Sequence, residues 1–165
     1  MQYILTKTGK RLPFHNARKV TDNNNQPVSL IVSFREAELQ TAGVADELLR
    51  TAMKNPEETL ELAAYNEADI LLNTYYRYCK LDEISCKYDY LISAYVPAIE
   101  PQEAQMDEEG NVIVPAIEGT EEIPEVRDTL IIVTLLKQSE LETKVEDTSR
   151  TVDAMAVAMA EMMGV

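Results

Sequence analysis

Hydrophobic residues alternate with polar ones in one part of the chain and recur at helical spacing in others. Between residues 28 and 34 every second position is apolar: Val28, Leu30, Val32 and Phe34. A period of two predicts a β-strand with this set facing the core. Between residues 44 and 53 the apolar residues repeat at intervals of three and four. Because Pro56 disfavours helical geometry at Asn55, we expect a short amphipathic helix to end there.

Four more stretches have strand composition. Residues 59–65, 68–79 and 84–96 are rich in Ile, Leu, Thr and Tyr, and residues 129–136 are apolar on both faces, which predicts a central strand. If Asp82-Glu83 is a two-residue turn, 68–79 and 84–96 form a hairpin. A bulge or one continuous bent strand is the alternative, because this turn lacks the Gly or Asn that tight hairpins prefer.

The hairpin interpretation gives a candidate binding face and a cysteine pair. The binding face would be formed by Tyr76, Tyr78, Lys87 and Asp89. Exposed tyrosines can stack on sugars or dock proteins, although ordinary cross-strand pairing would also explain them. Cys79 would lie opposite Cys86 within reach of a disulfide, but so few cysteines indicate a reducing compartment and favour free thiols.

Charge divides the chain into opposite segments. Residues 1–27 carry Lys and Arg before any acidic residue and contain many turn-forming residues, so we expect an irregular, basic N-terminal arm. Residues 97–127 form a Pro- and Glu-rich excursion, with nine carboxylates and no Lys or Arg between Glu100 and Glu125. The phrase Val-Pro-Ala-Ile-Glu occurs at both 96–100 and 114–118. This repetition predicts two extended legs of a protruding loop or β-finger, called the acidic finger below.

The last segment, 137–165, is predicted to be a coiled-coil-like amphipathic helix. Seven residues are spaced alternately by four and three: Leu141, Val145, Thr148, Val152, Met155, Met159 and Met162. With Val145, Val152 and Met159 at a and the others at d, they form the seam of a coiled coil. The alternative is a helix folded back onto its own sheet, which would show the same stripe.

Together these patterns predict an α+β fold. We expect a single mixed, mostly antiparallel β-sheet domain over residues 28–136, with one short helix and the acidic finger. The basic arm precedes this domain and the C-terminal helix follows it.

Candidate chemistry is sparse. The chain has one histidine, His15, in the irregular N-terminal segment, and two cysteines seven residues apart, so neither a Cys-His pair nor a zinc site is indicated. We therefore expect no catalytic residues, no metal, no cofactor and no enzymatic activity. A net charge of −14 opposes nucleic acid and anionic membranes as partners. The first residues contain no apolar stretch of signal-peptide length.

The order of parts resembles that of small structural or tail-accessory proteins, encoded in the baseplate region of phages and prophages of Gram-positive, Clostridia-like bacteria. The resemblance rests on the strand 28–34, a helix followed by Asn55-Pro56-Glu57-Glu58-Thr59, Tyr88-Asp89-Tyr90 opening a long strand, the Pro/Glu-rich excursion and the terminal helix. It covers about two thirds of the chain, from Val28 onward. The basic arm has no counterpart.

This resemblance implies a non-catalytic tail or baseplate component that acts through protein–protein contacts. Such a protein is made in the bacterial cytoplasm and ends in a virion or prophage-derived tail particle. Its expected partners are other tail or baseplate proteins and further copies of itself, with a trimer favoured by analogy with fibre-like particles. The alternatives are a carbohydrate or host-surface binding module that uses the tyrosine face, and a cytoplasmic tail-assembly chaperone, which the acidic charge would suit.

Overall fold

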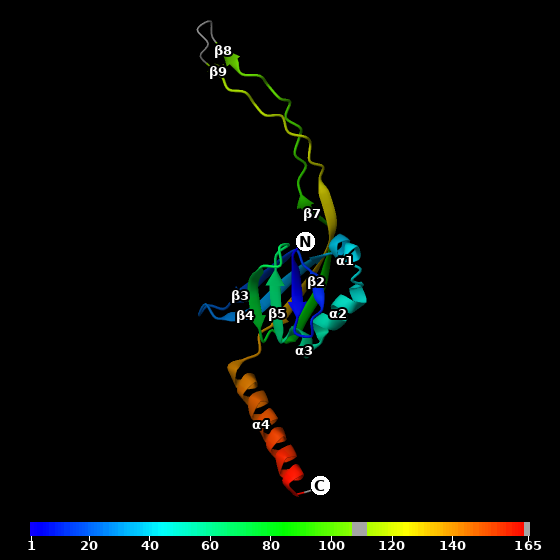
Figure 1. Ribbon diagram of the computed structural model, residues 1–165, viewed down its shortest axis with the longest axis vertical. Coiled ribbons are helices and arrows are strands. Elements are labelled where there is room, and N and C mark those ends of the chain that lie inside the picture. Colours follow the sequence, from blue (N-terminus) through cyan, green and yellow to red (C-terminus); the bar gives the residue numbers. More distant parts are fainter. Residues whose placement is uncertain (107–111, 164–165) are drawn as a thin grey trace. The chain divides into compact units, whose positions relative to one another are not determined.

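The computed structural model describes residues 1–106 and 112–163, which fall into two compact units (Figure 1). The larger unit comprises Met1–Cys86 with Ile131–Val165, and the smaller unit comprises Lys87–Leu130. The larger unit contains the hydrophobic core.

Two antiparallel four-stranded sheets form the framework. The first has the order β2-β1-β5-β6, from Arg11–Pro13, Tyr3–Thr6, Glu61–Tyr65 and Leu71–Tyr76. The second has the order β3-β4-β10-β7, from Asn16–Thr21, Pro27–Arg35, Val126–Leu136 and Lys80–Ser93. The apolar strand β10 lies inside the second sheet, as its two apolar faces predict.

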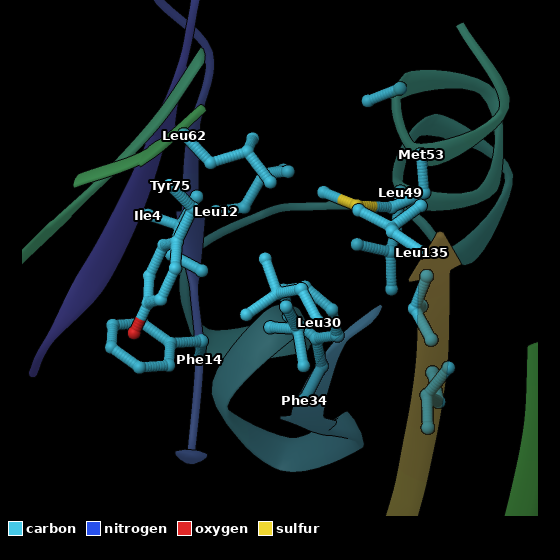
Figure 2. Packing of buried hydrophobic residues seen from close by; sticks show 14 of the residues in the cluster. Ile4, Leu12, Phe14, Leu30, Phe34, Leu49, Met53, Leu62, Tyr75 and Leu135 are labelled. Carbon is cyan, nitrogen blue, oxygen red and sulfur yellow. The ribbon is translucent and has the colours of Figure 1, made fainter. Parts of the chain in front are cut away.

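One hydrophobic core joins the two sheets. The first sheet contributes Ile4, Leu12 and Leu62, and the second contributes Leu30, Val32, Phe34, Val133 and Leu135, all fully buried. Figure 2 shows side chains from both sheets and from a helix meeting in this cluster. Their mutual burial is the main term that stabilises the larger unit.

Three short helices follow β4: α1 (Glu36–Thr41), α2 (Asp46–Lys54) and α3 (Pro56–Thr59). Helix α2 buries Leu49, Ala52 and Met53 against the core, which confirms the amphipathic helix expected here. Pro56 begins α3, and the Asn55 side chain caps it by accepting a hydrogen bond from the Glu57 N–H at 3.0 Å. A long helix, α4 (Glu140–Met163), ends the described chain.

The α+β class is confirmed, but the finer description was too simple. The strands divide between two sheets rather than one, and three short helices replace the single one expected. Periodicity shows which face of a strand is buried, but it does not show which strands share a sheet.

The expectation of an irregular N-terminal arm was wrong. Residues 1–27 contain β1, β2 and β3 and the beginning of β4. Ile4 and Leu12 pair across β1 and β2, and both are fully buried. These strands are short and carry polar residues between their few core positions, so turn signals dominate the sequence pattern.

The proposed turn at Asp82-Glu83 is also absent, because both residues lie inside the continuous strand β7. The chain turns earlier, after β6, where Arg77 has a φ of 63° and its N–H donates to the Leu60 carbonyl at 2.8 Å. Strands β6 and β7 consequently belong to different sheets. Cys79 lies outside both strands, Cys86 lies within β7, and both are free thiols, as favoured above.

Glu58 places a buried carboxylate between α3 and the β1–β2 hairpin. It is 3 % exposed, pairs with Lys10 at 2.5 Å and accepts hydrogen bonds from the hydroxyls of Thr6 and Thr8. Burial alone raises its pKa, but the hydrogen bonds from Lys10, Thr6 and Thr8 outweigh burial and lower the pKa from 4.5 to about 2. The charged form is therefore the one that the fold stabilises.

We expect Glu58→Gln to lower the free energy of unfolding at neutral pH by about 1–3 kcal/mol, because Lys10 and two hydroxyls lose an ionised acceptor. Since the folded pKa lies below the unfolded one, the stabilisation by Glu58 is present above pH 4.5 and is lost as the pH falls toward 2. Urea unfolding across this range would measure the slope. The exposed neighbour Glu57 supplies the control, Glu57→Gln, and equal effects of the two changes would contradict this assignment.

In the smaller unit, the two legs of the acidic finger pair as an antiparallel ribbon. Strands β8 (Gln105–Met106) and β9 (Val112–Val114) pair toward its end. Reciprocal backbone hydrogen bonds of 2.9–3.0 Å join Val96 to Ile123, Ile99 to Thr120, and Gln102 to Ile117. The two extended legs predicted from the repeated phrase are thus present, although the two copies of the phrase do not pair with each other.

These bridges recur every third residue, which is the period of a polyproline II turn rather than of a pleated strand. Prolines are accommodated because each of the four in the legs, Pro97, Pro101, Pro115 and Pro124, lies outside the bridged positions, where no backbone N–H is required. At Gly119 the two legs approach each other closely. A Cβ there would lie 2.7 Å from Pro101 Cδ and 2.9 Å from Pro101 N.

We expect Gly119→Ala to separate the legs near Pro101, because the added methyl group would meet backbone atoms. Amide exchange at Ile99, Gln102 and Thr120 should accelerate, while the thermal midpoint stays unchanged because the hydrophobic core lies in the larger unit. Hydrogen exchange with calorimetry measures both quantities. Unchanged exchange at all three amides would show that the close approach is not required.

Candidate assembly interface

Helix α4 begins at a capping box that its sequence encodes. The Ser139 hydroxyl accepts a hydrogen bond from the Glu142 N–H at 3.2 Å, and the Glu142 carboxylate accepts one from the Ser139 N–H at 2.9 Å. This reciprocal pair satisfies two donors that a helix start otherwise leaves unpaired. The signal was readable as Ser139-Glu-Leu-Glu142, and it fixes where the helix starts.

The first two turns of α4 make polar contacts with the segment before the helix, with the turn after β6 and with the start of β7. Gln138 donates to Glu146 at 2.7 Å, Arg77 lies 3.6 Å from Asp147, and Lys80 lies 3.4 Å from Glu142. Hydrogen bonds from Ser139 lower the pKa of Glu142, and the hydrogen bond from Gln138 lowers that of Glu146. These groups are exposed or only half-buried, so their ion pairs orient the helix more than they stabilise it.

The apolar seam of α4 is exposed along its length. Leu141, Val145, Val152, Met155, Met159 and Met162 are 54–81 % exposed, and Thr148 is exposed as well. A helix folded back onto its own sheet would bury these side chains. The fold-back alternative is therefore contradicted, and seven seam residues remain without a core of their own.

Charged residues after Lys144 avoid the seam and the positions beside it. Glu146, Asp147, Arg150, Asp153 and Glu161 occupy b, c and f positions, and Arg150 pairs with Glu146 at 2.6 Å along the outer side. The flanking e and g positions hold Ser149, Thr151, Ala156 and Ala158. Small, uncharged flanks allow neighbouring helices to approach closely, so the available contact is wider than the seam alone.

The tyrosine binding face is not formed as expected. Tyr78 is 2 % exposed and belongs to the core, where its ring meets Tyr75 edge-on, whereas Tyr76 is 58 % exposed. Lys87 and Asp89 are exposed but belong to the smaller unit, where Asp89 pairs with Arg127 at 3.0 Å. The predicted face required a hairpin with its turn at Asp82-Glu83. Because both residues lie inside β7, the four side chains do not share one face.

Among the residues that the structure describes, groups with catalytic potential are not brought together into a recognisable site. His15 donates its backbone N–H to the Ser33 carbonyl between β2 and β3. Cys79 lines an open depression of about 380 Å³ with Lys7, Glu146 and Arg150, but burial raises the pKa of its thiol, which disfavours the reactive thiolate. Within residues 1–106 and 112–163, no three His, Cys, Asp or Glu side chains group as metal ligands would.

No helix in the described part of the chain is long and apolar enough to cross a membrane. No family model matches the chain, and neither curated proteins nor solved structures show a significant match. The exposed seam is consequently the feature of the molecule itself that bears most directly on function.

Proposed function

We propose that this protein is a non-catalytic structural component of a phage or prophage tail or baseplate, which self-associates through α4 and contacts other tail proteins. The observation that carries self-association is the exposed seam. Burying valine, leucine and methionine side chains is worth about 1.5–3 kcal/mol each. Six such residues on one helix give a strong driving force for association, because the chain does not bury them itself.

A second copy of α4 is the partner that the seam fits best. Identical seams are self-complementary, because a and d residues of one helix pack between those of another. The capping box and the polar contacts at the base present the helix in one orientation. Small e and g residues suit a coiled coil of more than two helices, because these positions become more enclosed as helices are added. Valines at the a positions, Val145 and Val152, instead favour a dimer. We retain the trimer as the working state.

Assignment to a tail particle is supported by the resemblance in the order of parts, together with an assembly device at one end and an extended acidic finger elsewhere. The scarcity of groups suited to catalysis favours a structural role: the sequence has one histidine, and burial raises the pKa of the Cys79 thiol, which disfavours it as a nucleophile. The carbohydrate-binding alternative loses its geometric basis with the burial of Tyr78.

The double substitution Val152→Asp with Met159→Asp should convert the assembly to monomers of 18.6 kDa, because charges at two a positions would be buried in the seam. Sedimentation equilibrium over a range of concentrations measures the mass. Ala154→Asp with Val157→Asp is the matched control, since it adds the same charge to c and f positions of the same helix and should leave the mass unchanged. A wild-type protein that is monomeric throughout, or a mass that the seam substitutions do not alter, would overturn self-association by α4.

A tail component should copurify with intact particles. After prophage induction in the source bacterium, gradient-purified tails should contain the protein in a fixed ratio to the other structural proteins, measured by quantitative mass spectrometry. Recovery only from the unassembled fraction would instead support the chaperone alternative.

A further inference from the structure

Strand β3 presents a basic edge. Among the strands that the structure describes, it is the end strand of its sheet, so the backbone groups on its outer side have no neighbouring strand to pair with. Arg18 and Lys19 lie on this strand and are exposed. Within the part of the chain that the structure describes, neither forms an ion pair, whereas Lys10 and Arg11 are paired with Glu58 and Asp69.

Lys19 is held over the core while its charge remains accessible. Its register partner on β4 is Leu30, a core residue, and its ammonium group lies 5.3 Å from the centre of the Tyr75 ring. A lysine at such a position covers apolar surface with its stem and keeps its charge toward solvent. It also repels unsuitable strands from the open edge, which makes an acidic, extended segment the favoured occupant.

The acidic finger has the complementary properties. Glu100, Glu103, Glu118 and Glu121 each follow a bridged residue, and none is ion-paired within the described residues. The legs are extended, and backbone groups between the bridges lie outside the ladder. Four aliphatic side chains at bridged positions are also 42–52 % exposed: Val96, Ile99, Ile117 and Ile123. The glutamate carboxylates of one finger repel those of a second finger, so a surface that binds the finger must be basic.

We propose that the acidic finger of one copy docks along the β3 edge of a second copy, where its carboxylates pair with Arg18 and Lys19. This inference rests on the proposed function only for the presence of neighbouring copies, because it uses neither the seam nor any residue of α4. The contact joins two different surfaces and is therefore head-to-tail, which closes into a ring when the copies are related by rotation. Copies already held together would supply the high effective concentration that a charge-dominated contact needs.

The test is zero-length cross-linking of lysine to carboxylate in the full-length protein at low salt. Chains labelled with ¹⁴N and ¹⁵N are mixed in urea and refolded together. We expect Lys19 to be joined to Glu118, Glu121, Glu100 or Glu103, with mixed-isotope pairs as abundant as same-isotope pairs. Lys54, an exposed lysine elsewhere in the larger unit, provides the background yield.

Charge reversal tests the pairing itself. Arg18→Glu with Lys19→Glu should abolish linkage between β3 and the finger, because neither segment then holds a lysine amine. Glu118→Lys with Glu121→Lys should reduce linkage from Lys19 several-fold, because like charges then meet. Mixing these two variants should restore linkage between the same positions of different chains. Lys54→Glu is the control and should have no effect.

Three results would overturn the proposal: no linkage from Lys19 above the Lys54 background, linkage confined to same-isotope pairs, or no restoration on mixing. The first result would indicate that the finger binds a basic partner protein instead of β3. The second would indicate that the finger docks on β3 of its own chain. If the seam substitutions lower the measured mass but any of these three results is obtained, self-association by α4 stands and only the finger contact is wrong.

Discussion

Packing between the two sheets is the constraint on which the rest of the molecule depends. Phe34 and Leu30 from one sheet and Ile4 and Leu62 from the other fill the same space, and α2 covers this cluster with Met53 and its neighbours. The described core draws on residues 4–78 and 130–135. Once this core is closed, the apolar residues of α4 and of the finger have no place in it. They are available only for contacts made elsewhere.

The two elements with exposed apolar side chains, α4 and the acidic finger, differ in how their backbones are hydrogen-bonded. Helix α4 satisfies its own hydrogen bonds along its length, so its side chains alone decide what it contacts. The finger satisfies only every third residue through its ladder and leaves the intervening backbone groups to solvent or to a neighbour. The helix therefore offers only side chains to a neighbour, whereas the finger offers unpaired backbone groups as well. The same chain thus contains an element of each kind.

Sequence reasoning succeeded where one period governed a long stretch. It located β4, α2 and β10, and it placed a terminal helix whose predicted seam residues the structure leaves exposed. It failed where pairing depended on residues distant in sequence. Strands β1 and β2 are only four and three residues long, and β3 is recognisable mainly by its pairing with β4. The turn after β6 needed a positive φ at Arg77, a residue type that gives no warning of one. Tyr78 was assigned to solvent for that reason alone.

The three-residue ladder of the finger also has a consequence for how its length can vary. Insertion of three residues in each leg would add one bridge and leave every existing partner in register. Insertion of one residue on the base side of Pro101 and Pro115 would move both prolines onto positions that must donate a hydrogen bond, and insertion of two would bring other residues to the bridged positions. Gly119 would still face Pro101 after the permitted change. The length of the finger can therefore change in steps of three residues per leg without any change in the larger unit.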